Sequence, residues 1–269
     1  MKFKIKKAKM LKDFINLFSS ISLDLVIHVE NDKIVLMAQE VANVCYLGIV
    51  LEKNFCEEYS VTEKDVERDL CVDIRNLLKV FKSVKPDESV NMSYTSFVEG
   101  DSSTQKLIFQ FKQGKLDREF RVPLLDEGDV HPQDKLVMLN KMMGNDLVFK
   151  SIVNTDFDSF KVAIESTDIS NRKTGDDYSV QLAVKDGFFK INPKEDYSLS
   201  AFISFNEKCN CEDSMAGYSF EYLMKFVKVK LSDRIQLKFS ENYPLLFTLR
   251  DSEQFMLLGM VAPRVERDD

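Results

Sequence analysis

One segment of the chain reads Asp73-Ile74-Arg75-Asn76-Leu77-Leu78-Lys79-Val80-Phe81-Lys82. Its apolar residues recur at i, i+3, i+4 and i+7, and they are Ile74, Leu77, Leu78 and Phe81. Its basic residues Arg75, Lys79 and Lys82 recur at i, i+4 and i+7 on a separate stripe. Because each of these spacings follows one side of an α-helix, the segment predicts a short helix that packs its apolar side on a sheet and points its basic side outward.

Similar helical spacing occurs at residues 8–21, 156–167 and 219–229. The basic residues of these helices that lie outside the apolar stripes are Lys9, Lys12, Lys161, Lys225 and Lys228. Between the helices, apolar and polar residues alternate as they do in half-buried strands. The predicted strands are residues 23–29, 33–38, 46–51, 106–112, 178–184, 197–205, 234–239, 245–250 and 254–261.

The order of the predicted elements repeats. A helix is followed by strands, a second helix and more strands, and this series starts again after about residue 144. We therefore predict the α+β class, with two similar domains that each contain antiparallel sheets and two short helices. Residues 123–143 contain two prolines and a Met/Leu-rich stretch, which is typical of an inter-domain linker. The predicted boundaries are residues 1–122, the linker 123–143, and residues 144–269.

The composition favours a soluble globular protein, because 44% of the residues are hydrophobic and 30% are charged. No apolar run approaches the roughly 20 residues that a membrane helix needs. The N-terminus is basic but lacks the continuous apolar core and cleavage site of a signal peptide. The five cysteines are odd in number and unevenly spaced, which favours a reducing intracellular compartment over a disulfide framework.

The formal net charge is −7, which by itself argues against binding to nucleic acid, because such binding depends on neutralising phosphates. The distribution of charge argues the other way. Lysines gather on the predicted helices, whereas acidic residues gather at residues 57–58, 63–69, 126–129, 207–213 and 266–269. This pattern predicts weak, sequence-independent contact with duplex phosphates. The alternative is that the lysines only solvate exposed helix surfaces.

Residues that could carry catalysis are sparse. The two histidines are His28, in a predicted strand, and His131, in the predicted linker, and neither lies in the context of a catalytic triad. Cys209 and Cys211 have no second cysteine pair to complete a zinc site. No phosphate-binding glycine loop is present. We therefore predict a binding or scaffold protein with no catalytic residue, no metal and no cofactor; an enzyme of unknown type is the alternative from another class.

Three segments resemble one known family. The segments are Leu231-Ser232-Asp233-Arg234-Ile235 with the following Pro244-Leu245-Leu246-Phe247, the ending Val261-Ala262-Pro263-Arg264-Val265 before an acidic tail, and the helix that carries Lys79 and Lys82. Together they resemble the sliding clamps of the proliferating cell nuclear antigen (PCNA) type, and the resemblance spans nearly the whole chain. The C-terminal segment is its most specific part.

The resemblance implies a homotrimeric ring with a continuous outer sheet and with helices that line a hole for duplex DNA. The strands that join two subunits would be residues 106–112 of one copy and 197–205 of the next. The residues expected to face DNA, from the basic stripes and from the resemblance together, are Lys9, Lys12, Arg75, Lys79, Lys82, Lys161, Lys225 and Lys228.

The resemblance also implies a pocket for short hydrophobic-aromatic peptide motifs of partner proteins such as DNA polymerase and the clamp loader. Carried over residue by residue, the pocket would use Gln39, Asn43, Val44, Tyr46, Leu139, Met142, Pro244, Met260, Val261, Ala262 and Pro263. The chain departs from the family here, because Gly259-Met260 replaces an aromatic pair and Gln39 replaces a methionine.

The implied function is that of a processivity factor in DNA replication and repair, without enzymatic activity. The implied location is the nucleus, or a viral replication site if the chain is viral. Two alternatives share the fold: a subunit of a heterotrimeric checkpoint clamp, and a monomeric viral processivity factor.

Overall fold

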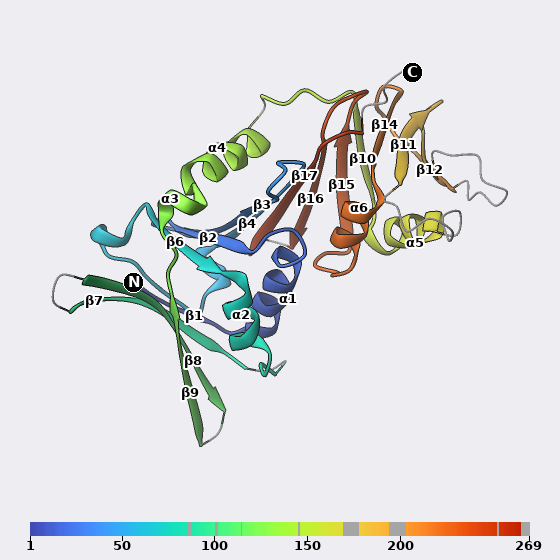
Figure 1. Cartoon of the computed structure of the whole chain (residues 1–269). Coiled ribbons are helices and arrows are strands. Elements are labelled where there is room, and N and C mark those ends of the chain that lie inside the picture. The colour runs from blue at the N-terminus through green and yellow to red at the C-terminus, as the bar shows by residue number, and fades with distance from the viewer. Residues whose placement is uncertain are drawn as a thin grey trace. The chain divides into compact units, whose positions relative to one another are not determined.

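The computed structural model describes residues 1–85, 88–99, 102–113, 115–144, 146–168, 178–193, 203–251 and 253–264 (Figure 1). The chain divides into two compact units. The first unit contains Met1–Val41, Leu47–Leu139 and Ser252–Met256, and the second contains Ala42–Tyr46, Asn140–Asp251 and Leu257–Asp269. In the described part of the chain, no helix is long and apolar enough to cross a membrane.

The first unit is built from two sheets and two helices that share one apolar core. The helices are α1 (Ala8–Phe18) and α2 (Ile74–Phe81). The sheets have the strand orders β5-β1-β7-β8-β9 and β4-β3-β2-β6. A cavity of only about 20 Å³ lies where Leu11 of α1, Leu77 of α2 and core residues of both sheets meet, so the core is tightly filled. The strands are β1 (Lys2–Ile5), β2 (Asp24–Val29), β3 (Lys33–Gln39), β4 (Cys45–Glu52), β5 (Glu58–Ser60), β6 (Arg68–Asp73), β7 (Val90–Glu99), β8 (Ser102–Gln113) and β9 (Leu116–Pro123).

The second unit repeats this plan. Its helices are α5 (Phe157–Thr167) and α6 (Phe220–Val227), and its sheets have the strand orders β10-β15-β16-β17 and β13-β12-β11-β14. The strands are β10 (Ser151–Asp156), β11 (Ser179–Lys185), β12 (Phe188–Pro193), β13 (Ile203–Lys208), β14 (Ser214–Ser219), β15 (Arg234–Phe239), β16 (Leu245–Asp251) and β17 (Phe255–Val261).

The two units correspond element by element. β1-β7-β8-β9 matches β10-β15-β16-β17, and β4-β3-β2-β6 matches β13-β12-β11-β14. The helices also occupy equivalent positions along the chain. In each unit the first helix, α1 or α5, follows the first strand, and the second helix, α2 or α6, follows the fifth strand that both units have. The strand β5 is the addition in the first unit. The predicted α+β class and the predicted pair of similar domains are therefore confirmed, while the exact domain boundaries stay a prediction.

The helices α2, α5 and α6 each begin where a side chain caps them, whereas α1 has no side-chain cap. Asp73 accepts a hydrogen bond from the backbone N–H of Arg75 at 2.8 Å, Asp156 accepts one from Ser159 at 2.7 Å, and Ser219 caps α6 through Tyr222. Such caps satisfy backbone N–H groups that have no partner inside the helix. The predicted apolar stripe of α2 needs one change, because Leu78 is only half-buried and Val80 is buried instead.

One predicted subunit-joining strand is wrong. Residues 106–112 lie in β8, which pairs with β7 on one side and with β9 on the other. Its backbone groups are therefore already used, and β9 forms the edge of that sheet. The predicted strands do not include β9, which begins only three residues after β8 ends, so the edge was assigned to β8. Of the predicted strand 197–205, residues 197–202 lie outside the described residues, and the rest begins the edge strand β13.

The segment predicted as a linker is largely helical. It contains α3 (Glu127–Val130) and α4 (Pro132–Met143), separated by His131 with a left-handed φ of 53°. Pro132 suits the first position of a helix, because it has no backbone N–H to leave unsatisfied there. The short 3₁₀ helices η1 (Lys53–Phe55) and η2 (Glu63–Asp65) flank β5.

Gly259 lies against the ring of Phe247 inside the second unit. A Cβ atom added at Gly259 would lie 1.8 Å from Cζ of Phe247. The Phe247 ring also packs against the ring of Phe226 on α6, with the two centroids 4.3 Å apart, so it has little room to move aside. The position before Met260 therefore has no room for the aromatic side chain that the family pattern leads one to expect there.

We expect Gly259→Ala to destabilise the chain by about 1–3 kcal/mol, because the added methyl group overpacks a filled core. Urea unfolding would measure the loss. The double variant Gly259→Ala/Phe247→Leu tests the cause, since removing the ring makes room for the methyl group. Its cost should be smaller than the sum of the two single costs. Strictly additive costs would show that the clash with Phe247 is not the reason.

Candidate nucleic-acid interface

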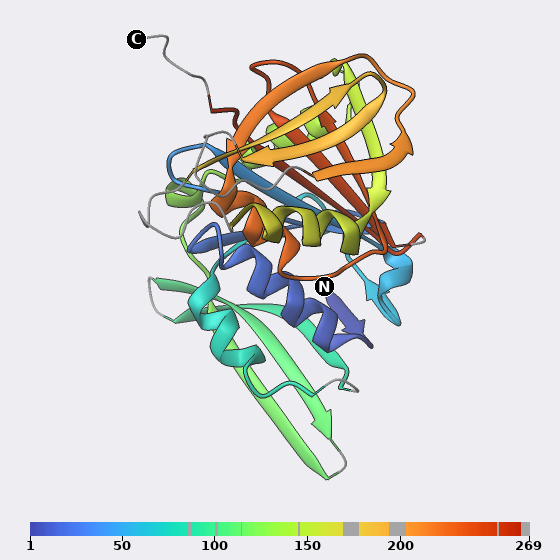
Figure 2. The same ribbon diagram turned by 90° about the vertical axis from the view of Figure 1, so that its right-hand side faces the viewer.

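The helices α1 and α2 lie side by side in the first unit (Figure 2). Their apolar sides are buried, and Phe81 of α2 packs edge-on against Phe109 and Phe111 of β8, with ring centroids 5.4 and 5.5 Å away. The basic side chains of Lys9, Lys79 and Lys82 are exposed. The fold thus brings the predicted basic residues of both helices onto one exposed helix pair.

Lys12 plays a different part from its neighbours. Its side chain is half-buried, and its Nζ donates a hydrogen bond to the carbonyl oxygen of Lys82 at 3.2 Å. Lys82 stands at the C-terminal end of α2, where carbonyl oxygens lack partners and carry partial negative charge. Lys12 therefore links α1 to the end of α2, and its ammonium group is partly engaged by that carbonyl oxygen.

Arg75 is also occupied. Its guanidinium forms a two-pronged ion pair with the carboxylate of Asp73, with Nη2–Oδ2 at 2.5 Å and Nε–Oδ1 at 3.0 Å. The side-chain hydrogen bond from Arg75 lowers the pKa of Asp73. In contrast, Lys9, Lys79 and Lys82 form no ion pair with any residue that the structure describes. These three lysines are the exposed basic residues of the first unit's helices that no ion pair with a described residue engages, although Asp13 lies near Lys9 and Asp73 near Lys79.

The second unit offers less free charge. Lys161 pairs with Glu165 (Nζ–Oε1 3.8 Å), and Lys225 pairs with Glu221 (Nζ–Oε1 2.7 Å), each four residues away on its own helix. Lys225 also lies over the ring of Tyr222, 4.6 Å from its centroid. Lys228 is exposed and has no ion pair within the described ranges. The i, i+4 spacing of the acidic partners is visible in the sequence, so this weakening was predictable and was missed.

Lys230, just beyond α6, is a basic residue that links elements and was not a predicted site residue. Its Nζ lies 2.6 Å from Oδ2 of Asp158 on α5 and 3.0 Å from Oδ1 of Asp233. Hydrogen bonds to these two carboxylates, first to Asp158, raise the pKa of Lys230. The side chain is exposed, so the bond contributes little to stability, but it fixes the end of the α6–β15 connection near α5.

The residues of the predicted partner pocket fall into two groups. One group is buried and cannot contact a partner peptide directly; it consists of Tyr46, Leu139, Met142 and Val261. The members with exposed or half-exposed side chains are Gln39, Asn43, Val44, Pro244, Met260, Ala262 and Pro263. Within the second unit, the backbone N–H of Ala262 donates to the carbonyl oxygen of Val44 at 2.8 Å. That bond holds the segment after β17 beside the residues that precede β4.

A buried polar cluster anchors the start of α4 in the first unit. His28 is 1% exposed on β2, and its Nδ1 lies 2.8 Å from Oδ1 of Asp69 on β6. Asp69 accepts a second hydrogen bond from Nε2 of Gln133 on α4 at 3.1 Å. Burial opposes the charged form of His28, but the hydrogen bond and charge of Asp69, with Glu67 and Glu30, raise the pKa of His28 overall.

Lys135 of α4 is buried as well, and its Nζ donates to the carbonyl oxygen of Val130 at the end of α3. Together with the Gln133–Asp69 bond, this contact fixes the first turn of α4 on the body of the first unit. No group of three or more His, Cys, Asp and Glu side chains converges to hold a metal ion in the described part of the chain.

Known proteins were compared with the chain over its full length. No family model matches it. The DNA polymerase sliding clamp of Thermofilum pendens is 24% identical over 239 residues, which are 86% of this chain and 85% of that relative. The PCNA of A. fulgidus, solved with the C-terminal region of FEN-1, superposes with a TM-score of 0.78 at 21% identity and 99% coverage of both chains. The chain has the sliding-clamp fold.

A second clamp structure supports the same conclusion. The complex of two PCNA subunits from Sulfolobus tokodaii matches with a TM-score of 0.77 at 17% identity, over 99% of this chain and all of that one. The clamp fold thus extends over both units. The resemblance seen in the C-terminal segments is confirmed at the level of the whole fold.

We expect the His28 cluster to make the stability of the clamp fold depend on pH. The pKa of His28 is raised in the folded chain above its ordinary 6.5. The cluster therefore stabilises the fold fully below about pH 6.5, and this contribution is lost as the pH rises through the folded-state pKa. Urea midpoints of the wild type and of His28→Gln, measured from pH 5.5 to 8.5, would reveal the difference.

The wild type should lose more stability across this range than His28→Gln does. Asp69→Asn retains the histidine but removes the main charge partner, so it should flatten the same pH dependence. Parallel curves for all three chains would show that His28 does not titrate as the geometry implies.

Proposed function

We propose that the chain is a subunit of a DNA sliding clamp that tethers DNA polymerase and other replication or repair proteins to duplex DNA. The observation that carries the proposal is the duplicated fold, with one strand order in both units and a basic helix pair in the first. The similarity to the Thermofilum pendens sliding clamp along most of both chains supports it.

The proposed mechanism is topological and requires no bond to be made or broken. A closed ring leaves DNA only at an end or by opening, so each phosphate contact can be weak and the ring can slide. A partner held on the ring stays at high effective concentration near its template. The net charge of −7 suits this role, because a mainly acidic protein with lysines on a few helices attracts DNA to those helices alone. We assign no catalytic step to the chain.

Ring closure would use the two sheet edges. β9 ends one sheet of the first unit and β13 ends one sheet of the second. Beside β13 lies a groove of about 510 Å³ whose apolar lining includes Val162, Ala163 and Phe205. Leu116 on β9 is 55% exposed, a large apolar side chain at an open edge. We place β9 of one copy against β13 of the next, with Leu116 over this groove, in a homotrimer.

Partner proteins would bind through short hydrophobic-aromatic peptides. The half-exposed residues Val44, Pro244, Met260, Ala262 and Pro263 are the predicted pocket members in the second unit that a peptide could contact without rearrangement. The clamp loader would be one such partner. The place of action would be the nucleus, or the replication site of a DNA virus.

The helix lysines should contribute unequally to processive DNA synthesis. We expect Lys79→Ala/Lys82→Ala to lower polymerase stimulation on primed circular DNA by roughly fivefold or more, because both lysines are exposed and neither forms an ion pair with a described residue. Lys161→Ala/Lys225→Ala should have a smaller effect, because both lysines are paired with glutamates. Primer extension with a cognate polymerase and loader measures this. Equal effects of the two double variants would contradict the assignment, and no effect of either would remove these lysines from the DNA-facing surface.

The subunit joint should depend on Leu116. Light scattering of the wild type should give about 93 kDa, which is three chains of 31.1 kDa. Leu116→Glu places a charge at the apolar joint and should give a single chain. Leu23→Glu is the matched control, because Leu23 is 65% exposed and belongs to neither β9 nor β13. A wild type that is monomeric at micromolar concentration would instead favour a monomeric processivity factor.

A further inference from the structure

The two units differ at one sheet edge. In the first unit, β5 pairs with the outer edge of β1, so that Lys2, Phe3 and Lys4 face Ser60, Tyr59 and Glu58. In the second unit, β10 is the equivalent of β1, and among the described residues no strand pairs with its outer edge. An open strand edge presents backbone N–H and C=O groups that can pair with another extended chain.

The difference comes from one connection. Residues 53–67 link β4 to β6 in the first unit and carry β5, whereas only residues 209–213 link β13 to β14 in the second. Both connections start with the same hydrogen bond, from Lys53 N–H to the Asp32 carbonyl and from Cys209 N–H to the Gly187 carbonyl, each at 2.7 Å. The positions therefore correspond, and the second unit is shorter by ten residues, which include the whole covering strand.

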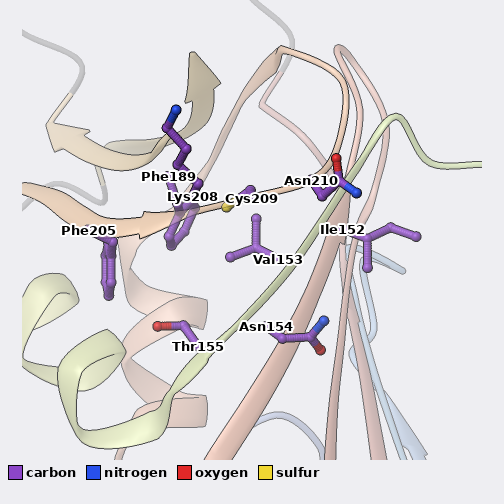
Figure 3. A pocket seen from close by; sticks show the side chains of 9 residues that line it. All are labelled: Ile152, Val153, Asn154, Thr155, Phe189, Phe205, Lys208, Cys209 and Asn210. Atoms are coloured by element: carbon purple, nitrogen blue, oxygen red, sulfur yellow. The ribbon is translucent and has the colours of Figure 1, made fainter. Parts of the chain in front are cut away.

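A cavity lies beside the open edge. It measures about 160 Å³ and is lined by residues of β10, β12, β13 and the short connection (Figure 3). Val153 of β10 points into it toward Phe189 and Phe205, whereas Ile152 points away. A cavity of roughly 150 Å³ is large enough to hold a benzene ring. The space is therefore large enough for one aromatic side chain.

The first unit shows what fills the equivalent place. Phe3 stands where Val153 stands, because each lies two residues before the last buried residue of its strand, Ile5 and Thr155. Tyr59 of β5 packs on Phe3 with ring centroids 4.9 Å apart, and its hydroxyl lies 2.6 Å from the carbonyl oxygen of Glu30. In the second unit, a smaller valine and the loss of the covering tyrosine leave the space open.

Charge adds a second requirement. Beside Tyr59, Glu57 pairs with Lys4 of the covered strand, with Oε2–Nζ at 3.0 Å. At the open edge, the exposed Lys208 lines the cavity, and its Nζ lies 5.7 Å from the centroid of the Phe188 ring. No carboxylate in the described part of the chain pairs with Lys208. An acidic residue on an incoming chain would find a partner there.

We propose that the outer edge of β10 binds an extended peptide segment of a partner protein, which adds as a strand, inserts an aromatic side chain opposite Val153 and places an acidic residue near Lys208. This site is separate from the pocket predicted by the family resemblance. It does not depend on whether the chain encircles DNA.

The test uses the full-length chain and a fluorescein-labelled peptide with the sequence of residues 57–62, which is the covering segment of the first unit. Fluorescence anisotropy should show saturable binding. A peptide with Tyr59→Ala should bind at least about tenfold more weakly, because the cavity then stays unfilled. Alkylation of Cys209, which lines the cavity, should slow when the peptide is bound.

Variants of the chain locate the site. Val153→Phe fills the cavity and should weaken binding about tenfold, and Lys208→Glu should weaken it several-fold. Lys141→Glu makes the same charge change on an exposed residue of α4 and should leave binding unchanged. If Val153→Phe does not fold, the Lys208→Glu variant and the peptide with alanine in place of Tyr59 together test whether the peptide binds at this site.

Equal binding of the tyrosine and alanine peptides, or full binding by Lys208→Glu, would overturn the proposal. The same variants would also show whether the edge binds a second copy of this chain. If the chain associates beyond its ring state, and Val153→Phe abolishes this association while the peptide does not compete with it, the edge binds a second copy and not a partner peptide.

Discussion

The hydrogen-bonding groups along the edge of a sheet are the constraint on which this molecule depends. Every strand inside a sheet has both sides paired, but the outermost strands expose N–H and C=O groups that water or another chain must satisfy. Since the two units share one strand order, their edges fall at equivalent places. An edge can be covered by another segment of the same chain, paired with a second copy in a ring, or left open for a partner protein. The segment next to each edge decides which of these applies.

The helices are subject to a second constraint: their apolar sides must be buried in the core, and their charged sides must face outward. Short helices such as α2 are marginal alone, so burial of residues such as Phe81 has to stabilise them. Their outward sides remain free to carry charge. In the first unit, Lys9, Lys79 and Lys82 form no ion pair with a described residue, whereas in the second unit Lys161 and Lys225 pair with glutamates on the same helices and Lys228 does not. More of the unpaired helix lysines therefore lie in the first unit.

Much of the fold was predictable from residue spacing. The predicted helices at 8–21, 73–84, 156–167 and 219–229 all exist, because their apolar stripes act locally and, in the last three, capping residues do so as well. The strands β1, β5, β6, β7, β9, β10 and β14 were not predicted; β5, for example, has only three residues, which carry too little pattern. The joint strand was misplaced because β9, which ends that sheet, was among the strands not predicted. The i, i+4 pair of Glu221 and Lys225 could also have been predicted, because the sequence analysis already placed both residues on one helix.

The helical state of α4 has a consequence for length. Its twelve residues span roughly 18 Å as a helix, whereas the same residues fully extended would reach roughly 40 Å. The start of this helix is held by Gln133 and Lys135, and its later part by the buried side chains of Leu139 and Met142. As a helix, the connection between the units therefore reaches about 20 Å less far than the same residues would as an extended chain.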